Sequence, residues 1–167
     1  EVRVIDHYTN NSEPLGHYAK VVKEKPYTYG THLAPFDMKF REMVAGGTRL
    51  EYMSSLGLRM TVVPQKSVAD GLQNVRTLLP RCWFDADKCK KGIESLINYK
   101  RKWNKKTNAF SETPLHDEFS DDADAFRTLA NGVRLIPECK FFRPKQDSLP
   151  RRATMNYDVF DDSPYYL

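Results

Sequence analysis

The sequence predicts an α/β protein, because strand-like and helix-like segments alternate along most of its length. Short β-branched runs, such as residues 58–63, alternate with segments whose apolar residues recur at helical spacing. The chain has 167 residues, the size of one ordinary domain, and its hydrophobic fraction of 40% is enough for a core. Its net charge of +4 permits nucleic-acid binding without requiring it.

Composition also excludes several classes of protein. No run approaches the roughly 18 consecutive apolar residues that a membrane helix needs, so we expect no membrane partner. The three cysteines form no C-x-x-C pair, which argues against a disulfide scaffold or a zinc site and favours a reducing, intracellular setting. No phosphate-binding P-loop sequence is present, so the chain itself is not expected to bind ATP in that way.

The first elements are predicted from β-branched alternation and from prolines. A strand is expected at Glu1–Tyr8, where β-branched residues alternate between two faces. Pro14 suits the first position of a helix, and Pro26 then ends it. Tyr27–Ala34 is a second strand candidate, and it leads directly into Asp37.

Capping signals place the next elements. Thr48 and Glu51 have the spacing of a capping box, which predicts a short helix that Gly57 ends. A third strand is expected at Leu58–Val63, where proline follows. Ser67 then has the character of an N-cap residue for another helix.

The second half of the chain predicts two longer helices. One helical pattern runs from about Ala86 to Trp103. The next begins near His116 or Ser120 and ends at Ala130, because an Asn-Gly pair follows.

Both ends of the chain carry an expectation about domain organisation. Beyond Gly132 the periodicity fades and prolines recur, so residues 133–167 are predicted to be an extended tail or docking arm. Residues 1–132 would then form the folded domain. Because the chain opens directly on a strand, we expect a partner strand upstream of Glu1.

Acidic residues concentrate at residues 116–126. On a helix, Asp117, Asp121 and Asp124 would fall on one face. Like charges at that spacing repel by a few tenths of a kcal/mol per pair, which favours a cation among them. The alternative is that these acids gather at a helix N-terminus because the macrodipole favours negative charge there. Asp124 borders the predicted apolar face, and a partly buried charge needs a partner.

A second candidate acid, Asp37, follows a predicted strand. Ligands gather beyond the carboxyl ends of strands in open α/β sheets, although Asp37 could also be an ordinary turn residue after Pro35. Carboxylates from a strand end and a helix suit Mg²⁺ or Mn²⁺. Two such ions, about 3.5–4 Å apart, can hold the attacking water and the leaving oxygen of a phosphodiester.

Basic residues crowd the stretch that precedes the acidic segment, with Tyr99 and Trp103 among them. We expect five of them to bind DNA phosphates close to the acids without reading base sequence: Lys100, Arg101, Lys102, Lys105 and Lys106. The alternative is a solvated helix face followed by a lysine-rich loop. Trp103 is expected to pack against the fold, as a tryptophan at a helix end usually does.

Two long stretches contain motifs in a recognisable order. One is GLQNVRTLLPRCWFDADKCKKGIESLINYKRKWNKK followed by PLHDEFSDDADAFRTLA, and the other is the opening EVRVIDHYTNNSEPLGHYAKVVKEKPYTYGTHLAPFD. Together they resemble the nuclease domain of tailed-phage terminase large subunits over residues 1 to about 132. The resemblance implies an RNase H-like mixed sheet flanked by helices, related to RuvC resolvases. It also implies a Mg²⁺- or Mn²⁺-dependent endonuclease that cuts concatemeric viral DNA by a two-metal-ion mechanism.

By position, the resemblance implies roles for individual acids. Asp37 would be the second acid of the site, Asp124 the late helical acid, and Asp121 a further metal ligand. His116 and Asp117 match the His-Asp pair before that helix and would be auxiliary. The family's first acid and its ATPase domain lie upstream of the matching region, so we expect a fragment of a longer polypeptide.

The resemblance further implies partners and a location. The partners are double-stranded DNA, the portal ring, the terminase small subunit and the ATPase domain of the same polypeptide, in the host cytoplasm during phage assembly. Two alternatives stay open. One is a non-catalytic module that docks on the portal or procapsid through residues 133–167, and the other is a RuvC-like resolvase of the same fold.

Overall fold

The computed structural model describes residues 1–41 and 47–136 and confirms a mixed α/β chain. Its strands are β1 (Val2–Val4), β2 (His32–Ala34), β3 (Met60–Val62), β4 (Cys82–Phe84), β5 (Arg101–Asn104) and β6 (Ala109–Pro114). Its α-helices are α1 (Leu15–Glu24), α2 (Arg49–Ser55), α3 (Val68–Leu78), α4 (Lys90–Asn98) and α5 (Ser120–Gly132). Of the expected tail, only residues 133–136 belong to the described part, so the division at residue 132 stays a prediction.

The described strands form three separate pairs. β1 pairs with β4 and β2 pairs with β3, both parallel, whereas β5 and β6 form an antiparallel hairpin. The parallel register places His32 opposite Met60 and Ala34 opposite Val62, so β2 and β3 end at the same edge. Because no hydrogen-bonded ladder joins these pairs within the described residues, an RNase H-like mixed sheet stays an expectation.

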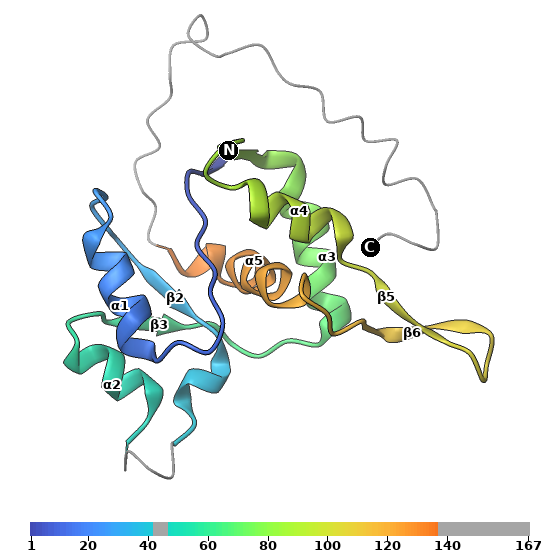
Figure 1. The fold of residues 1–167 in the computed structure, drawn as a ribbon, viewed down its shortest axis with the longest axis horizontal. Coiled ribbons are helices and arrows are strands. Elements are labelled where there is room, and N and C mark those ends of the chain that lie inside the picture. The colour runs from blue at the N-terminus through green and yellow to red at the C-terminus, as the bar shows by residue number, and fades with distance from the viewer. Residues whose placement is uncertain (42–46, 137–167) are drawn as a thin grey trace, which may run out of the picture.

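Helix α5 is the central element of the described fold. It lies between the region of α1, α2, β2 and β3 and the region of α3 and α4 (Figure 1), and it contacts α3, α4 and β2. Phe126 belongs to a buried cluster with Val75, Leu78 and Ala130, which joins α5 to α3. A second cluster, formed by Ala19, Ala34, Met38, Met53 and Leu58, joins α1 and α2 to β2.

The end of α5 packs tightly on the β2–β3 pair. A Cβ atom added at Gly132 would lie 2.6 Å from Cγ2 of Val63 and 2.9 Å from Cδ1 of Leu33. Glycine is therefore required here by close approach, and it brings the acid-bearing helix against the strands that lead to Asp37.

Local capping signals are confirmed. The Thr48 side chain accepts from the backbone N–H of Glu51, while the Glu51 carboxylate accepts from the backbone N–H of Thr48. Gly57 follows α2 with φ of 82°, a left-handed conformation that glycine adopts without strain. Ser67 caps α3 by accepting from the backbone of Asp70.

The helix expected from about Ala86 to Trp103 is shorter at both ends in the structure, and its prediction is wrong for residues 99–103. Helix α4 ends at Asn98, and the chain then forms the hairpin β5–β6. Two local features favour the turn: Asn104 Oδ1 accepts from the backbone of Lys106 at 2.9 Å, and Asn108 adopts a positive φ of 51°. The strands β1 and β2 are also shorter than their alternation suggested.

No helix in the described ranges combines the length and the apolar composition that crossing a bilayer requires.

Candidate acidic cleft beside helix α5

A cleft of about 680 Å³ lies between α5 and the loops that follow β2 and β3. Asp37, Asp121 and Asp124 all line it, so three acids from two distant parts of the sequence share one cleft. Lys66 and Arg127 line it as well and bring positive charge to the same surface. Its walls therefore combine carboxylates with cationic side chains.

Asp37 belongs to a short 3-10 helix, Phe36–Lys39, just beyond the end of β2. Its Oδ2 lies 3.8 Å from Nη1 of Arg49, and the side chain is 44% exposed. Its Oδ1 is buried and has no hydrogen-bond partner among the residues that the structure describes. A buried carboxylate oxygen without a donor is costly, so a cation or another donor would stabilise this atom.

Asp124 is held through one of its two oxygens. The Tyr99 hydroxyl donates to Oδ1 at 2.9 Å, and Nη2 of Arg127 lies 3.0 Å from the same Oδ1. Within the described residues, Oδ2 has no protein donor, and 46% of the side chain is exposed. The second oxygen is thus available to a ligand while the first fixes the orientation of the carboxylate.

The two donors to Asp124 are themselves fixed by packing. Burial of the phenol, together with its hydrogen bond to the Asp124 carboxylate, raises the pKa of Tyr99 above its ordinary value. The Tyr99 hydroxyl therefore stays protonated and donates the hydrogen bond to Asp124. The stem of Arg127 packs on α3, because a Cβ at Gly71 would lie only 2.8 Å from Cδ of Arg127.

The remaining predicted acids are distributed differently. Asp121 is exposed in the first turn of α5 and lines the cleft. His116 and Asp117 precede α5, so the expectation that Asp117 shares its helical face is wrong. Nδ1 of His116 hydrogen-bonds to Oγ of Ser120 at 2.9 Å, and Asp117 Oδ1 accepts from the backbone of Phe119. Both residues organise the start of α5 and do not line the cleft.

The donor set fits a hard divalent cation, because carboxylate oxygens are the ligands that Mg²⁺ and Mn²⁺ prefer. Among the described residues, neither Oδ1 of Asp37 nor Oδ2 of Asp124 accepts a hydrogen bond from the protein. Both residues line the same cleft, which supports that fit. As the described side chains stand, no three His, Cys, Asp or Glu residues converge closely enough to hold a metal ion. Binding would therefore need these carboxylates to approach one another.

A buried acid on the same helix, Asp122, was not among the predicted site residues. Asp122 accepts from Oγ of Ser95 at 2.9 Å, and its Oδ1 lies 3.4 Å from Nε2 of His7. Both Asp122 and Ser95 are buried. The available signal was helical spacing: Asp122 is four residues before Phe126, which marks the buried face. Tyr99 and Arg127 were also overlooked as partners of Asp124.

The predicted basic residues lie on the hairpin and the residue before it, not on a helix face. Lys100, Arg101, Lys102, Lys105 and Lys106 are all exposed. Trp103 was expected to be packed, but it is 43% exposed. Within the described residues, its indole makes a ring contact with Phe110 alone, across the hairpin.

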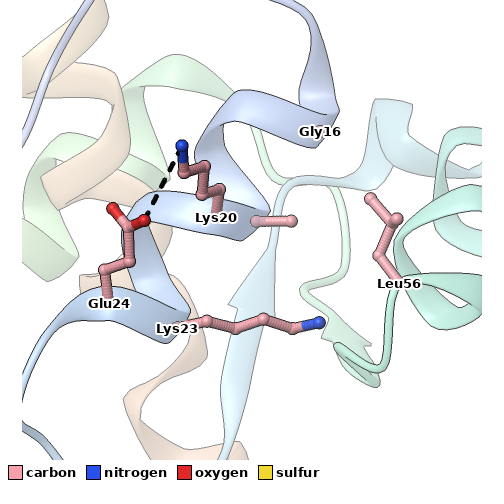
Figure 2. A pocket seen from close by; sticks show the side chains of 6 residues that line it. Gly16, Lys20, Lys23, Glu24 and Leu56 are labelled. Atoms are coloured by element: carbon pink, nitrogen blue, oxygen red, sulfur yellow. Dashed lines mark ion pairs between the residues drawn. The ribbon is translucent and has the colours of Figure 1, made fainter.

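A second, smaller hollow of about 400 Å³ lies between α1 and the end of α2 (Figure 2). Ala19 and Leu56 form its apolar floor, and Lys20 pairs with Glu24 at 3.7 Å along α1. An exposed ion pair of this kind is ordinary on a helix surface, and the hollow has no set of converging polar groups.

Comparison of the chain with protein-family models, with curated protein sequences and with solved structures gave no match.

Proposed function

We propose that this chain is a metal-dependent endodeoxyribonuclease domain of the terminase large-subunit type, which hydrolyses duplex DNA. The observation that carries the proposal is the shared cleft of Asp37, Asp121 and Asp124, in which Asp37 Oδ1 is buried without a donor from the described part of the chain. An acid that follows a strand and acids on a helix line the same cleft, and a two-metal phosphodiesterase would need them to approach one another around the cations.

Each residue of the cleft has a proposed task. Asp37 and Asp124 would hold Mg²⁺ or Mn²⁺, with Asp121 as a further ligand. The bound cations would supply an activated water and stabilise the leaving oxygen. Tyr99 and Arg127 keep the Asp124 carboxylate in one orientation by holding its Oδ1. The charges of Lys66 and Arg127 would attract the phosphate of the substrate.

The wider setting of this activity is part of the same proposal and depends on the sequence resemblance. It comprises packaging of concatemeric viral DNA, with the portal ring, the terminase small subunit and an upstream ATPase domain as partners in the host cytoplasm.

The first test is metal binding. Electron paramagnetic resonance of Mn²⁺ should show binding to the wild-type chain and at least about tenfold weaker binding for Asp37→Asn and for Asp124→Asn. Asp87→Asn is the matched control, because Asp87 is an exposed acid outside the cleft. Equal Mn²⁺ affinity in all four proteins would contradict the proposal that Asp37 and Asp124 are metal ligands.

The second test is cleavage of supercoiled plasmid with Mn²⁺, using the chain and a version extended upstream through the strand that the resemblance implies. Asp37→Asn and Asp124→Asn should each abolish cleavage. A comparison of four-way junctions with linear duplex separates the two nuclease classes, since a resolvase prefers branched DNA. Full activity in both variants would overturn the assignment.

A further inference from the structure

The hairpin β5–β6 projects from the body of the fold (Figure 1). All four residues of β5 are exposed, and the backbone hydrogen bond from Leu115 to Lys100 at 2.9 Å closes its base. An isolated two-stranded hairpin is only marginally stable in water. No residue of β5 belongs to the core of the described part of the chain. The residue types of β5 are therefore better explained by contact with a partner than by packing against the core.

Trp103 is the prominent apolar side chain of this hairpin. Its ring centroid lies 4.7 Å from that of Phe110, and the two ring planes meet at 71°. Phe110 lies directly opposite on β6, so the edge-to-face contact fixes the indole on one face of the hairpin. The remaining 43% exposure leaves a large aromatic surface for a ligand.

Charge identifies the kind of partner. Lys100, Arg101, Lys102, Lys105 and Lys106 surround Trp103 in the sequence. Within the described residues, none of these five side chains forms an ion pair. Cations that have no ion-pair partner among the described residues, and that lie near an exposed aromatic residue in the sequence, complement a polyanion that also presents flat apolar faces. That combination is typical of surfaces that bind single-stranded nucleic acid.

We propose that hairpin β5–β6 binds unpaired nucleotides of a nucleic-acid strand, with Trp103 stacked on a base and the neighbouring cations on its phosphates. Stacking requires an accessible base face, which a paired duplex does not offer along its length. The identification of that strand as the DNA to be cut depends on the proposed function. Tyr99, the residue before Lys100, donates to Asp124, so the base of the hairpin is joined directly to the acidic cleft.

The test uses intrinsic fluorescence in EDTA, where no cleavage occurs. The chain contains two tryptophans, so Trp83→Phe makes Trp103 the sole reporter. This protein is titrated with a 12-nucleotide single strand, with a blunt duplex of the same sequence, and with phosphatidylcholine–phosphatidylserine vesicles. Quenching by the single strand, at higher affinity than by the duplex, is the expected result. Response to the vesicles alone would overturn the proposal in favour of a membrane surface.

Variants then separate stacking from charge, with anisotropy of a labelled single strand as the readout. Trp103→Ala should weaken binding about 5- to 100-fold, whereas Trp103→Phe and Trp83→Phe should retain most of the affinity. Replacing Lys100, Lys102 and Lys105 by alanine should flatten the log–log salt dependence by about 2. Unchanged affinity in Trp103→Ala, in protein whose circular dichroism matches wild type, would overturn the proposal.

Binding of the single strand by the hairpin can be tested separately from metal binding in the cleft. Asp37→Asn should bind the single strand as wild type does in EDTA, because Asp37 belongs to the 3-10 helix after β2 and not to the hairpin. Loss of Mn²⁺ binding would therefore contradict the proposed nuclease site without affecting the hairpin. Loss of the Trp103 effect would contradict the hairpin proposal without affecting the site.

Discussion

Helix α5 and hairpin β5–β6 are neighbours in the sequence, and both are rich in charged residues. The two differ in burial, because α5 packs inside the fold and the hairpin is exposed. Helix α5 packs against α3, α4 and β2, so the positions of its aspartates are fixed by buried neighbours. The hairpin exposes every residue of β5, and local turn geometry shapes it. Substitutions of the buried residues of α5 should therefore change stability, whereas substitutions of the exposed residues of the hairpin should change binding alone.

The largest expected effect is at the end of α5. Gly132→Ala should lower the free energy of unfolding by about 1–3 kcal/mol, because the added methyl would overlap Val63 and Leu33. Gly30→Ala is the matched control, since a Cβ there meets no atom within 4 Å. Urea denaturation of both variants measures the difference. Equal stability of the two would show that α5 is not held tightly against the strands.

The next effect separates two adjacent aspartates of α5. Asp122→Ala should cost about 2 kcal/mol, because it leaves the buried hydroxyl of Ser95 without its acceptor. Asp121→Ala should change stability by less than about 0.5 kcal/mol, since Asp121 is exposed. A double mutant with Ser95→Ala should recover part of the loss in thermal denaturation. Strict additivity of Asp122→Ala and Ser95→Ala would contradict this coupling.

Tyr99 lies between the two regions, so its removal should have an intermediate effect. Tyr99→Phe should cost about 1 kcal/mol, because the buried phenol loses its hydrogen bond to Asp124. It should also weaken Mn²⁺ binding about 10-fold, since Asp124 loses one of the two groups that orient it. Urea denaturation measures the stability change, and calorimetric titration with Mn²⁺ measures the affinity. Unchanged metal affinity would leave Tyr99 a purely structural residue.

A smaller effect depends on pH and concerns Asp6. The hydrogen bond and charge of Lys25, 2.5 Å away, hold the pKa of Asp6 below its ordinary value of 3.8. A lowered pKa in the folded state stabilises the fold above pH 3.8, and this contribution is lost as pH falls through the folded pKa. At pH 7 the free energy of unfolding of wild type should exceed that of Asp6→Asn by less than about 1 kcal/mol. The free energies of unfolding of the two proteins, measured as a function of pH, should converge in acid. A difference that stays constant with pH would contradict the proposed effect of Lys25 on Asp6.

The smallest expected change is in the hairpin. Trp103→Ala should alter the free energy of unfolding by less than about 0.5 kcal/mol, because its ring is exposed and, among the described aromatic rings, contacts only Phe110. Scanning calorimetry of this variant beside Trp103→Phe provides the measurement. A loss of more than about 1 kcal/mol would place the hairpin in the cooperative core, and the contrast with α5 would fail.

Much of the candidate site was predictable because its residues occupy local landmarks. Asp37 follows a strand and Asp124 borders the apolar face of a helix, and both features can be read over a few residues. The capping box of Thr48 and Glu51 is equally local. The partners of Asp124 were not predictable in this way. Tyr99 is 25 residues away and reaches it only because α4 packs against α5.

Local signals are enough to predict the α/β class, most helix starts and the acids that line the cleft, because caps, prolines and spacing act within a few residues of the chain. The remaining features depend on contacts between residues that are distant in the sequence. Helical periodicity continues past Asn98, but burial of Tyr99 and its bond to Asp124 end the helix there and send Trp103 into a hairpin. Asp122 is likewise buried because Ser95 and His7 meet it from other elements. Such long-range contacts override local preference, since one buried hydrogen bond outweighs the small propensity differences between neighbouring residues.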